Sequence, residues 1–224
     1  MKTSWRIVML SMLLAAGASA RAEDQPFVSL FDGKDLSSWT AAPGSRWIVA
    51  NGLIALDDRS DGQEHNYEYL WTKETYGNFV LDLEFKIPER ANSGVFLRTP
   101  DMKDPVQTGI EIQVCNSFGK TEWSKGNCAG AVYDCLAPSE NAVKPPGQWN
   151  RCVITCNKNK ITVVLNGRQV IDMDVDRWTL PGKNPDGTEN KYGKAIKDFA
   201  REGRVGLQDH GLPVWYRNVK IKRL

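Results

Sequence analysis

The sequence predicts an all-β protein in which two antiparallel sheets form a sandwich. Apolar and polar residues alternate with a period of two in several short segments, and turns rich in Asn and Gly separate those segments. This period matches a strand, whose successive side chains point to opposite faces of the sheet. The one helical candidate is the short segment 192–200, inside a polar loop. Many short strands at close spacing favour a two-sheet sandwich.

The chain begins with the features of a secretory signal peptide. Lys2 and Arg6 give a positive start, residues 7–16 form an apolar run too short to span a bilayer, and an Ala-Ser-Ala sequence ends at Ala20. Cleavage is expected after Ala20 or two residues later, and an uncleaved membrane anchor is the alternative. We therefore predict a single domain over 21–224, a periplasmic or secreted location and no transmembrane segment.

The charge balance argues against a nucleic-acid partner. Without Lys2 and Arg6 of the leader, the 29 basic residues fall to 27 and equal the 27 acidic residues. The lysines are scattered along the chain, so the sequence lacks the clustered cations of a phosphate-binding surface.

The strands can be placed one by one. Apolar residues alternate with mostly polar ones in 79–87, and the same alternation in 215–222 is interrupted by Arg217, which falls on the apolar face. The further strands are expected at 27–31, 46–50, 53–56, 68–72, 94–98, 109–115, 130–134, 149–157, 160–166, 169–173 and 204–208.

The connections between strands are of two kinds. Short turns with residues that tolerate positive φ predict hairpins at Asn51-Gly52, Asn157-Lys158-Asn159 and Asn166-Gly167. Long loops are expected at 57–67, 99–108 with 116–129, and 174–203. Loops longer than about 12–15 residues are often functional, so we expect these to wall a cleft on one face of the sandwich.

Five cysteines lie in the middle of the chain. An oxidising compartment permits disulfides, but an odd number leaves at least one thiol unpaired. Cys152 and Cys156 lie about 13 Å apart along one strand and cannot pair with each other. Cys115 with Cys135 is the first pair to test. Structural zinc is disfavoured, because the chain has no CxxC motif and only two histidines.

Glu111 is a candidate catalytic carboxylate. In the strand GIEIQV it alternates with isoleucines and shares a face with Gln113, which suits the sugar-binding side of a sandwich; a solvated strand face is the alternative. A glucanase of the retaining type carries Glu-x-Asp-x-x-Glu on such a strand, but here Gln113 and Asn116 replace the later carboxylates. Double displacement needs a second carboxylate at about 5–5.5 Å, and this strand does not supply one.

His210 is the second catalytic candidate. It lies in the turn QDHGLP between two strands, and its ordinary pKa suits proton transfer near neutrality; an ordinary surface histidine is the alternative. Gln208 lies in the same turn and is a candidate for substrate binding. His65 has weaker support, because it lies in a polar loop.

Cationic and aromatic side chains supply further substrate-binding candidates. Arg98, Lys144 and Arg217 are the cations; Arg217, on an apolar face, needs a partner, which could be Glu111, Asp209 or substrate. Most tryptophans are expected in the core. Trp123 and Trp178 lie in polar loops instead, where they could stack on sugar rings or simply anchor the loops.

A resemblance covers nearly the whole chain from Phe27. The segments that carry it are FVSLFDGKDLSSW (27–39), YGNFVLDLEFKI (76–87), NSGVFLR (92–98), GIEIQV (109–114), GAVY (130–133), APSENAVKPPGQWN (137–150), LNGRQV (165–170) and GRVGLQDHGLPVWYRNVKI (203–221). With these segments the chain resembles the 3-keto-disaccharide hydrolase family, also described as 3-keto-glucoside 1,2-lyase–3-keto-2-hydroxyglucal hydratase and formerly as domain of unknown function 1080. The resemblance implies a concanavalin A-like jelly-roll sandwich that acts on sugars whose C3 hydroxyl has been oxidised to a ketone, downstream of a glycoside 3-dehydrogenase.

The chemistry implied by the resemblance is elimination. A C3 ketone acidifies the C2 proton, so that a base can remove it and the C1 group can leave; water then adds to the resulting glucal. This requires one base, one acid and a positive charge near the enolate oxygen. Glu111 and His210 would be base and acid in either order. Arg98, Arg217 or a divalent metal ion would stabilise the enolate, although Glu111, His210 and Gln113 form a sparse ligand set. A noncatalytic carbohydrate-binding module and a conventional glucanase-like hydrolase are the alternatives.

Overall fold

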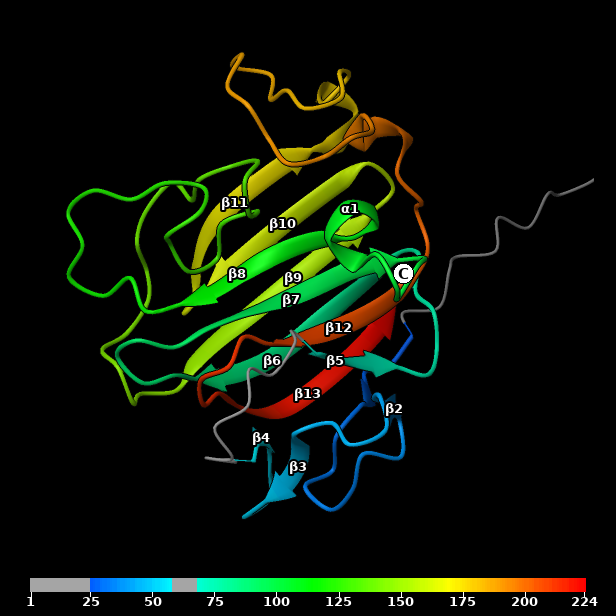
Figure 1. Cartoon of the computed structure of the whole chain (residues 1–224), viewed down its shortest axis with the longest axis vertical. Helices are drawn as coiled ribbons and strands as arrows, with labels where there is room; N and C mark the ends of the chain where they lie inside the picture. Colours follow the sequence, from blue (N-terminus) through cyan, green and yellow to red (C-terminus); the bar gives the residue numbers. More distant parts are fainter. Residues whose placement is uncertain (1–24, 58–67) are drawn as a thin grey trace, which may run out of the picture.

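The computed structural model describes residues 25–57 and 68–224, and its strands form two antiparallel sheets that lie face to face (Figure 1). One sheet has eight strands: β1 (Val28–Ser29), β3 (Trp47–Ala50), β4 (Leu53–Leu56), β6 (Phe79–Lys86), β9 (Asn150–Asn157), β10 (Lys160–Leu165), β11 (Arg168–Asp174) and β13 (Trp215–Arg223). Their order is β11-β10-β9-β6-β13-β4-β3, and β1 also pairs with β13.

The other sheet has five strands: β2 (Trp39–Thr40), β5 (Glu68–Thr72), β7 (Asn92–Thr99), β8 (Ile110–Cys115) and β12 (Arg204–Asp209). Their order is β2-β5-β12-β7-β8. The predicted all-β, jelly-roll sandwich of two antiparallel sheets is therefore confirmed. The predicted signal peptide (1–20), most of the loop 57–67 and His65 lie outside the described residues.

The core fills the space between the sheets. Leu81 and Leu83 of β6 and Val95 and Leu97 of β7 are all 0% exposed and belong to one hydrophobic cluster. Alternation along each strand puts one residue in two into this cluster and leaves the others on the outer faces. The outer face of the five-stranded sheet is therefore free to carry function.

The predicted hairpins are confirmed. The turn residues Asn51, Lys158 and Asn166 all have φ close to +50°, and each joins two antiparallel strands of the eight-stranded sheet. Asn is among the side chains that tolerate this left-handed conformation best, and the Gly that follows Asn51 and Asn166 continues it at no steric cost.

Helical structure is confined to loops. α1 (Pro105–Thr108) and two 3-10 turns, Val175–Arg177 and Ile196–Asp198, are short, so the helical candidate at 192–200 is reduced to a single turn. Within the part of the chain that the structure describes, no helix is long and apolar enough to cross a membrane.

The strand predicted at 130–134 is wrong. Only the isolated bridges Ile112↔Val132 and Val132↔Leu136 form there. Gly130 and Asp134 both have positive φ, which bends the segment away from a regular strand. The segment nevertheless bonds to the edge of β8, since the Tyr133 N–H donates to the carbonyl of Glu111 at 2.9 Å.

The cysteine pairing is also wrong for this structure. All five cysteines are buried and free, so Cys115 and Cys135 are not joined. Burial raises the pKa of the Cys115 and Cys135 thiols to about 12, which keeps both as thiols near neutral pH.

Candidate functional site

The outer face of the five-stranded sheet, called here the site face, gathers polar and aromatic side chains. Register places two cross-strand rows on it: Glu111–Phe96–Gly206–Trp71, and Gln113–Gly94 with Gln208–Tyr69. The intervening residues Val95 and Ile112 point the other way, into the core. The predicted placement of Glu111 and Gln113 on one face is thus confirmed, and Gln208 shares it.

Two glycines let large side chains lie flat on the site face. A Cβ at Gly94 would lie 2.5 Å from Oε1 of Glu111, and a Cβ at Gly206 would lie 2.3 Å from the ring of Trp71. The Glu111 side chain therefore leans from β8 over β7, and the Trp71 ring leans from β5 over β12. Both positions need glycine because there is no room for a Cβ.

Glu111 is a buried carboxylate paired with a lysine. Glu111 is 5% exposed, and its Oε2 lies 3.2 Å from Nζ of Lys191. Burial raises the pKa of Glu111, and the nearby charges of Lys191 and His210 act in the opposite direction. Because a buried carboxylate with a raised pKa is a stronger base than a solvated one, this pair can accept a proton and stabilise negative charge.

The Lys191 ammonium has an aromatic neighbour as well. Its Nζ lies 4.5 Å from the ring centroid of Tyr133, a cation–π distance. Burial, together with Glu111, raises the pKa of the Tyr133 hydroxyl, which is thereby kept protonated as a donor. Neither Lys191 nor Tyr133 was among the candidates from the sequence.

The backbone around Lys191 is fixed by α1 and the start of β8. Gln107 donates from Nε2 to the carbonyl of Lys191 at 2.8 Å and accepts from the N–H of Gly193 at 3.0 Å. The next residue, Tyr192, is 1% exposed and donates from its hydroxyl to the carbonyl of Gly109 at 3.2 Å. Lys191 is therefore held in place although it lies in a long loop.

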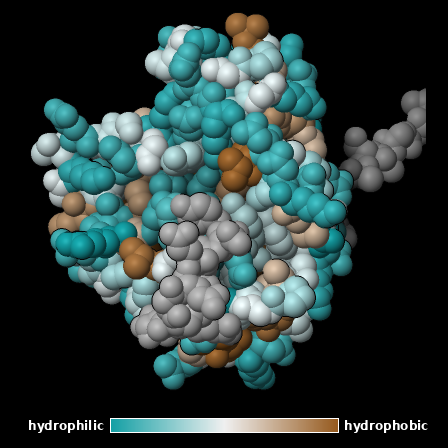
Figure 2. All heavy atoms as spheres, in the orientation of Figure 1, coloured by the Kyte–Doolittle hydropathy of each residue, from teal (hydrophilic) through white to brown (hydrophobic). Residues whose placement is uncertain are grey.

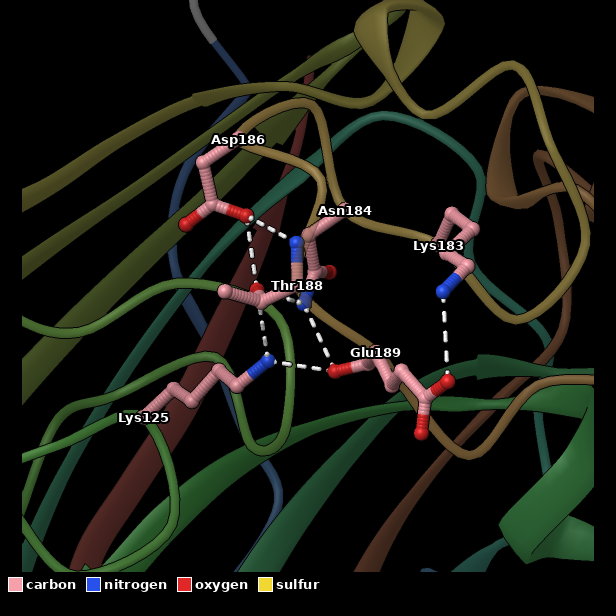
Figure 3. Close-up of polar contacts among 6 residues, drawn as sticks. All are labelled: Lys125, Lys183, Asn184, Asp186, Thr188 and Glu189. Carbon is pink, nitrogen blue, oxygen red and sulfur yellow. Dashed lines mark hydrogen bonds and ion pairs between the residues drawn. The ribbon is translucent and has the colours of Figure 1, made fainter.

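The turn just before Lys191 is held together by the side-chain amide of Asn184 (Figure 3). Asn184 is 5% exposed; its Nδ2 donates to Thr188 Oγ1 at 3.1 Å and to the carbonyl of Glu189 at 3.0 Å. Lys125, from the loop 116–129, donates to the same Glu189 carbonyl at 2.5 Å. Lys125 thus joins the loop 116–129 to the loop 174–203 two residues before Lys191.

The remaining polar groups of the site face offer acceptors. Gln113 donates from Nε2 to Asn92 Oδ1 at 3.0 Å, but its Oε1 is buried without a hydrogen-bond partner, and so is Oε1 of Gln208. A buried acceptor without a partner is costly, so both amides suit a ligand that brings hydroxyl groups. His210 follows β12 directly, is half-buried, and acts electrostatically on Glu111.

A cavity of about 400 Å³ opens on the site face beside Tyr69 and Trp71. Trp71 stacks on Tyr69 with ring centroids 5.1 Å apart, and Met102 and Lys103 complete one wall. Glu111 does not line this cavity, because Phe96 lies between Glu111 and Trp71 in the cross-strand row. The described surface in Figure 2 is mainly hydrophilic, and its hydrophobic residues are scattered rather than gathered in one patch.

The three predicted cations do not reach the site. Arg98 is 2% exposed and donates to the carbonyls of Gly77 and Lys158, so it pins strand ends together. Lys144 donates to the carbonyl of Trp149, away from the site face. Arg217 pairs with Glu84 at 2.6 Å on the outer face of the eight-stranded sheet.

The prediction that Arg217 lies on the apolar face is wrong because β13 contains a bulge. The register shifts between Arg217 and Lys220, and Asn218 has φ +52°. A bulge inserts a residue and reverses the alternation beyond it, so the side chain that the pattern placed inside points outwards.

The two loop tryptophans anchor loops. Trp178 is 4% exposed and donates from Nε1 to Asn184 Oδ1 at 2.8 Å, which excludes it as a stacking platform. Trp123 is half-buried and donates to the carbonyl of Pro138 at 3.0 Å. Sequence position in a polar loop is thus a poor guide to exposure.

The residues do not fit the suggested metal site. Within residues 25–57 and 68–224, no group of three or more His, Cys, Asp or Glu side chains could hold a metal ion. The carboxylate of Glu111 is bound instead by an ammonium group. The cation beside Glu111 is therefore Lys191.

The chain matches, over residues 26–222, the family described as 3-keto-alpha-glucoside-1,2-lyase-like domain. A curated Bacteroides thetaiotaomicron protein named 3-keto-disaccharide hydrolase is 24% identical over 227 residues, which cover 88% of this chain and 78% of the relative.

Solved structures give the same picture. A crystal structure of a Parabacteroides distasonis protein, provisionally named a glycosyl hydrolase, is 35% identical with a TM-score of 0.76, and the match covers 89% of this chain and 100% of the other. A second protein of that organism with the same provisional name is 26% identical with a TM-score of 0.69, covering 88% and 94%. A Bacillus subtilis protein with a galectin-like fold, 14% identical with a TM-score of 0.57 over 88% and 94%, is similar in fold alone.

Proposed function

Because the chain belongs to the 3-keto-alpha-glucoside-1,2-lyase-like family, we propose that it is an exported enzyme that cleaves 3-keto-glycosides by β-elimination and hydrates the product. The observation that carries this proposal is the pair of Glu111 and Lys191 on the site face, with Oε2 and Nζ 3.2 Å apart. Elimination next to a ketone needs one base and one positive charge, whereas ordinary glycoside hydrolysis needs two carboxylates.

Each group has a role in the first half-reaction. Glu111 removes the C2 proton, and the electron pair moves onto the C3 oxygen as an enolate, which the Lys191 ammonium stabilises. The enolate then forms the C1–C2 double bond while the C1–O bond breaks. His210 donates its proton to the leaving oxygen, which releases the alcohol and a 3-keto-2-hydroxyglucal.

The second half-reaction restores both groups. His210 takes a proton from water, whose oxygen adds to C1, and protonated Glu111 returns a proton to C2. The product is the free 3-keto sugar. Gln113 and Gln208 accept hydrogen bonds from sugar hydroxyls through their buried, unpartnered oxygens.

The proposal is tested with a 3-keto-glucoside in D₂O. Elimination followed by hydration places deuterium at C2 of the released sugar, whereas direct hydrolysis leaves the C2 proton in place. We expect deuterium at C2 and no turnover of the unoxidised glycoside. Equal turnover of both glycosides contradicts the mechanism. So does unlabelled product together with an unchanged cleavage rate for substrate that carries deuterium at C2, since unlabelled product alone also forms when Glu111 returns the abstracted proton to C2.

Variants assign the roles. Glu111→Gln should lower turnover at least about 10²-fold, as loss of a general base does. The matched control is Glu84→Gln, which removes a carboxylate from the opposite sheet. A noncatalytic binding module, the remaining alternative, would bind the sugar and show no turnover in wild type, Glu111→Gln or His210→Ala.

Two further parts of the proposal concern the cellular setting. Export follows from the leader at residues 1–20, and N-terminal sequencing of the exported protein should give Arg21 or Glu23 as the first residue. A 3-keto-glycoside must be supplied by an oxidation at C3, so the enzyme would act after a glycoside 3-dehydrogenase. Retention of residues 1–20 in the mature protein contradicts the cleaved leader.

A further inference from the structure

The eight-stranded sheet lies on the other side of the sandwich from the site face (Figure 1). Its outer face carries an excess of basic side chains. Register places its outward residues in cross-strand rows on β13, β6 and β9: Trp215–Lys86, Arg217–Glu84–Arg151, Lys220–Asp82 and Lys222–Val80. Five cations therefore face two carboxylates. We call these residues, with Trp149 and Phe27, the basic face.

Most of the basic face is internally paired. Arg151 binds Asp82 through two contacts of 2.9 and 2.7 Å, Lys220 lies 3.4 Å from the same carboxylate, and Arg217 lies 2.6 Å from Glu84. Both carboxylates are thus already neutralised. Even with Lys222 left out of the count, four cations face these two carboxylates, so the face keeps a positive charge for a partner from solution.

Lys86 is the cation best placed for such a partner. Its ammonium lies 4.7 Å from the ring centroid of Trp215 and 5.2 Å from that of Trp149. Among the described residues no carboxylate lies within ion-pair distance of it. A half-buried ammonium held only by two indole rings lacks an anion, and a carboxylate or sulfate would supply it.

We propose that the basic face binds an acidic polysaccharide. The Arg217 guanidinium already covers the Trp149 ring, 4.0 Å from its centroid, whereas the partly exposed indole of Trp215 can stack on the C–H face of a sugar ring while Lys86 pairs with an acidic substituent. A cavity of about 470 Å³ continues the same face; Phe27, Arg151 and Lys220 line it together with the paired carboxylates of Asp82 and Glu84. This site is separate from the site face and would hold the enzyme on an anionic glycan without taking part in turnover.

The test measures binding of the mature chain to polygalacturonate, with dextran as the neutral comparison, by affinity electrophoresis at about 50 mM and about 500 mM salt. We expect polygalacturonate to retard the protein at the lower salt only, and dextran to have no effect. Lys86→Gln should weaken binding about tenfold, the effect of losing one hydrogen bond to a charged group, and should leave turnover of a 3-keto-glucoside unchanged.

The matched control is Lys160→Gln, since Lys160 is an exposed lysine of the same sheet whose partner is Asp174 at 3.3 Å. Binding that is unaffected by Lys86→Gln, or weakened equally by Lys160→Gln, overturns the proposal. Retardation by double-stranded DNA at equal charge concentration overturns the assignment to a polysaccharide. Failure of this test leaves the elimination mechanism standing, because that mechanism uses none of these residues.

Discussion

Replacing Gly94 by Ala is expected to displace the carboxylate of Glu111, the proposed base, while the sandwich still folds. A Cβ at this position would lie 2.5 Å from Oε1 and 2.9 Å from Cγ of Glu111, whereas ordinary contacts begin near 3.4 Å. The carboxylate must therefore move by roughly 0.9 Å, and with it the 3.2 Å contact to Lys191. A misplacement of about 1 Å in a reacting group can cost about 10²-fold in rate, which is the loss we expect in kcat.

The assay compares turnover of a 3-keto-glucoside with the thermal unfolding temperature. Overpacking costs about 1–3 kcal/mol, or a fall in Tm of roughly 2–12 °C for a chain of this size, so the variant remains folded at 25 °C. Gly77→Ala is the control, because its Cβ would meet no atom nearer than the Arg201 carbonyl oxygen at 3.5 Å, an ordinary contact distance. A Gly94→Ala variant with kcat within about twofold of wild type refutes the reasoning, since the carboxylate would then tolerate displacement.

Three other predictions concern stability and its link to activity. Burial raises the pKa of Glu111 in the folded protein, so its ionised form destabilises the fold increasingly as the pH rises through that pKa. Glu111→Gln should therefore gain in Tm relative to wild type as the pH rises above about 4.3, the pKa of an ordinary glutamate, and a difference in Tm that does not change with pH speaks against a raised pKa. Arg98→Ala removes hydrogen bonds to two carbonyls and should lower Tm by roughly 6–12 °C, for a cost of about 3 kcal/mol, with KM unchanged. A raised KM at an unchanged Tm would indicate that Arg98 binds substrate. Asn184→Ala should lower kcat as well as Tm, because the turn that Asn184 organises leads directly into Lys191; an unchanged kcat would show that Lys191 is fixed by Gln107 alone.

The strands were predictable because the sequence of each strand by itself indicates which side chains face the core and which face outwards. Alternation along 79–87 sorts its side chains between the core and the outer face, and an Asn-Gly turn adopts positive φ in any hairpin. Positions 130–134 and 217 failed for the opposite reason. Their conformation depends on a bulge or on positive-φ residues within the segment, which the alternation pattern does not report.

Half of the candidate site was beyond the sequence. Glu111 and Gln113 share a strand, so their common face follows from spacing alone. Lys191 reaches Glu111 across 80 residues, from a polar loop without periodicity. One signal was present, since a carboxylate on a buried strand needs a cation. The cations that the sequence predicted for the site were Arg98, Lys144 and Arg217. All three are occupied elsewhere, Arg98 and Lys144 by backbone carbonyls and Arg217 by Glu84.

The side chains near Glu111 also show whether the site holds a second carboxylate that could act as a nucleophile on a glycosidic bond. Gln113, one step along the strand, is held by Asn92 and is an amide, which cannot act as a carboxylate nucleophile. Asn116 lies past the end of β8, where it donates to the carbonyl of Glu89 at 2.9 Å and caps a turn. The groups that act electrostatically on Glu111 are Lys191 and His210, so the strand offers one carboxylate without a second carboxylate as nucleophilic partner. A site of this composition lacks the second carboxylate that double displacement needs, and this supports the proposed function, in which the substrate itself carries the activating group as a ketone beside the C2 proton.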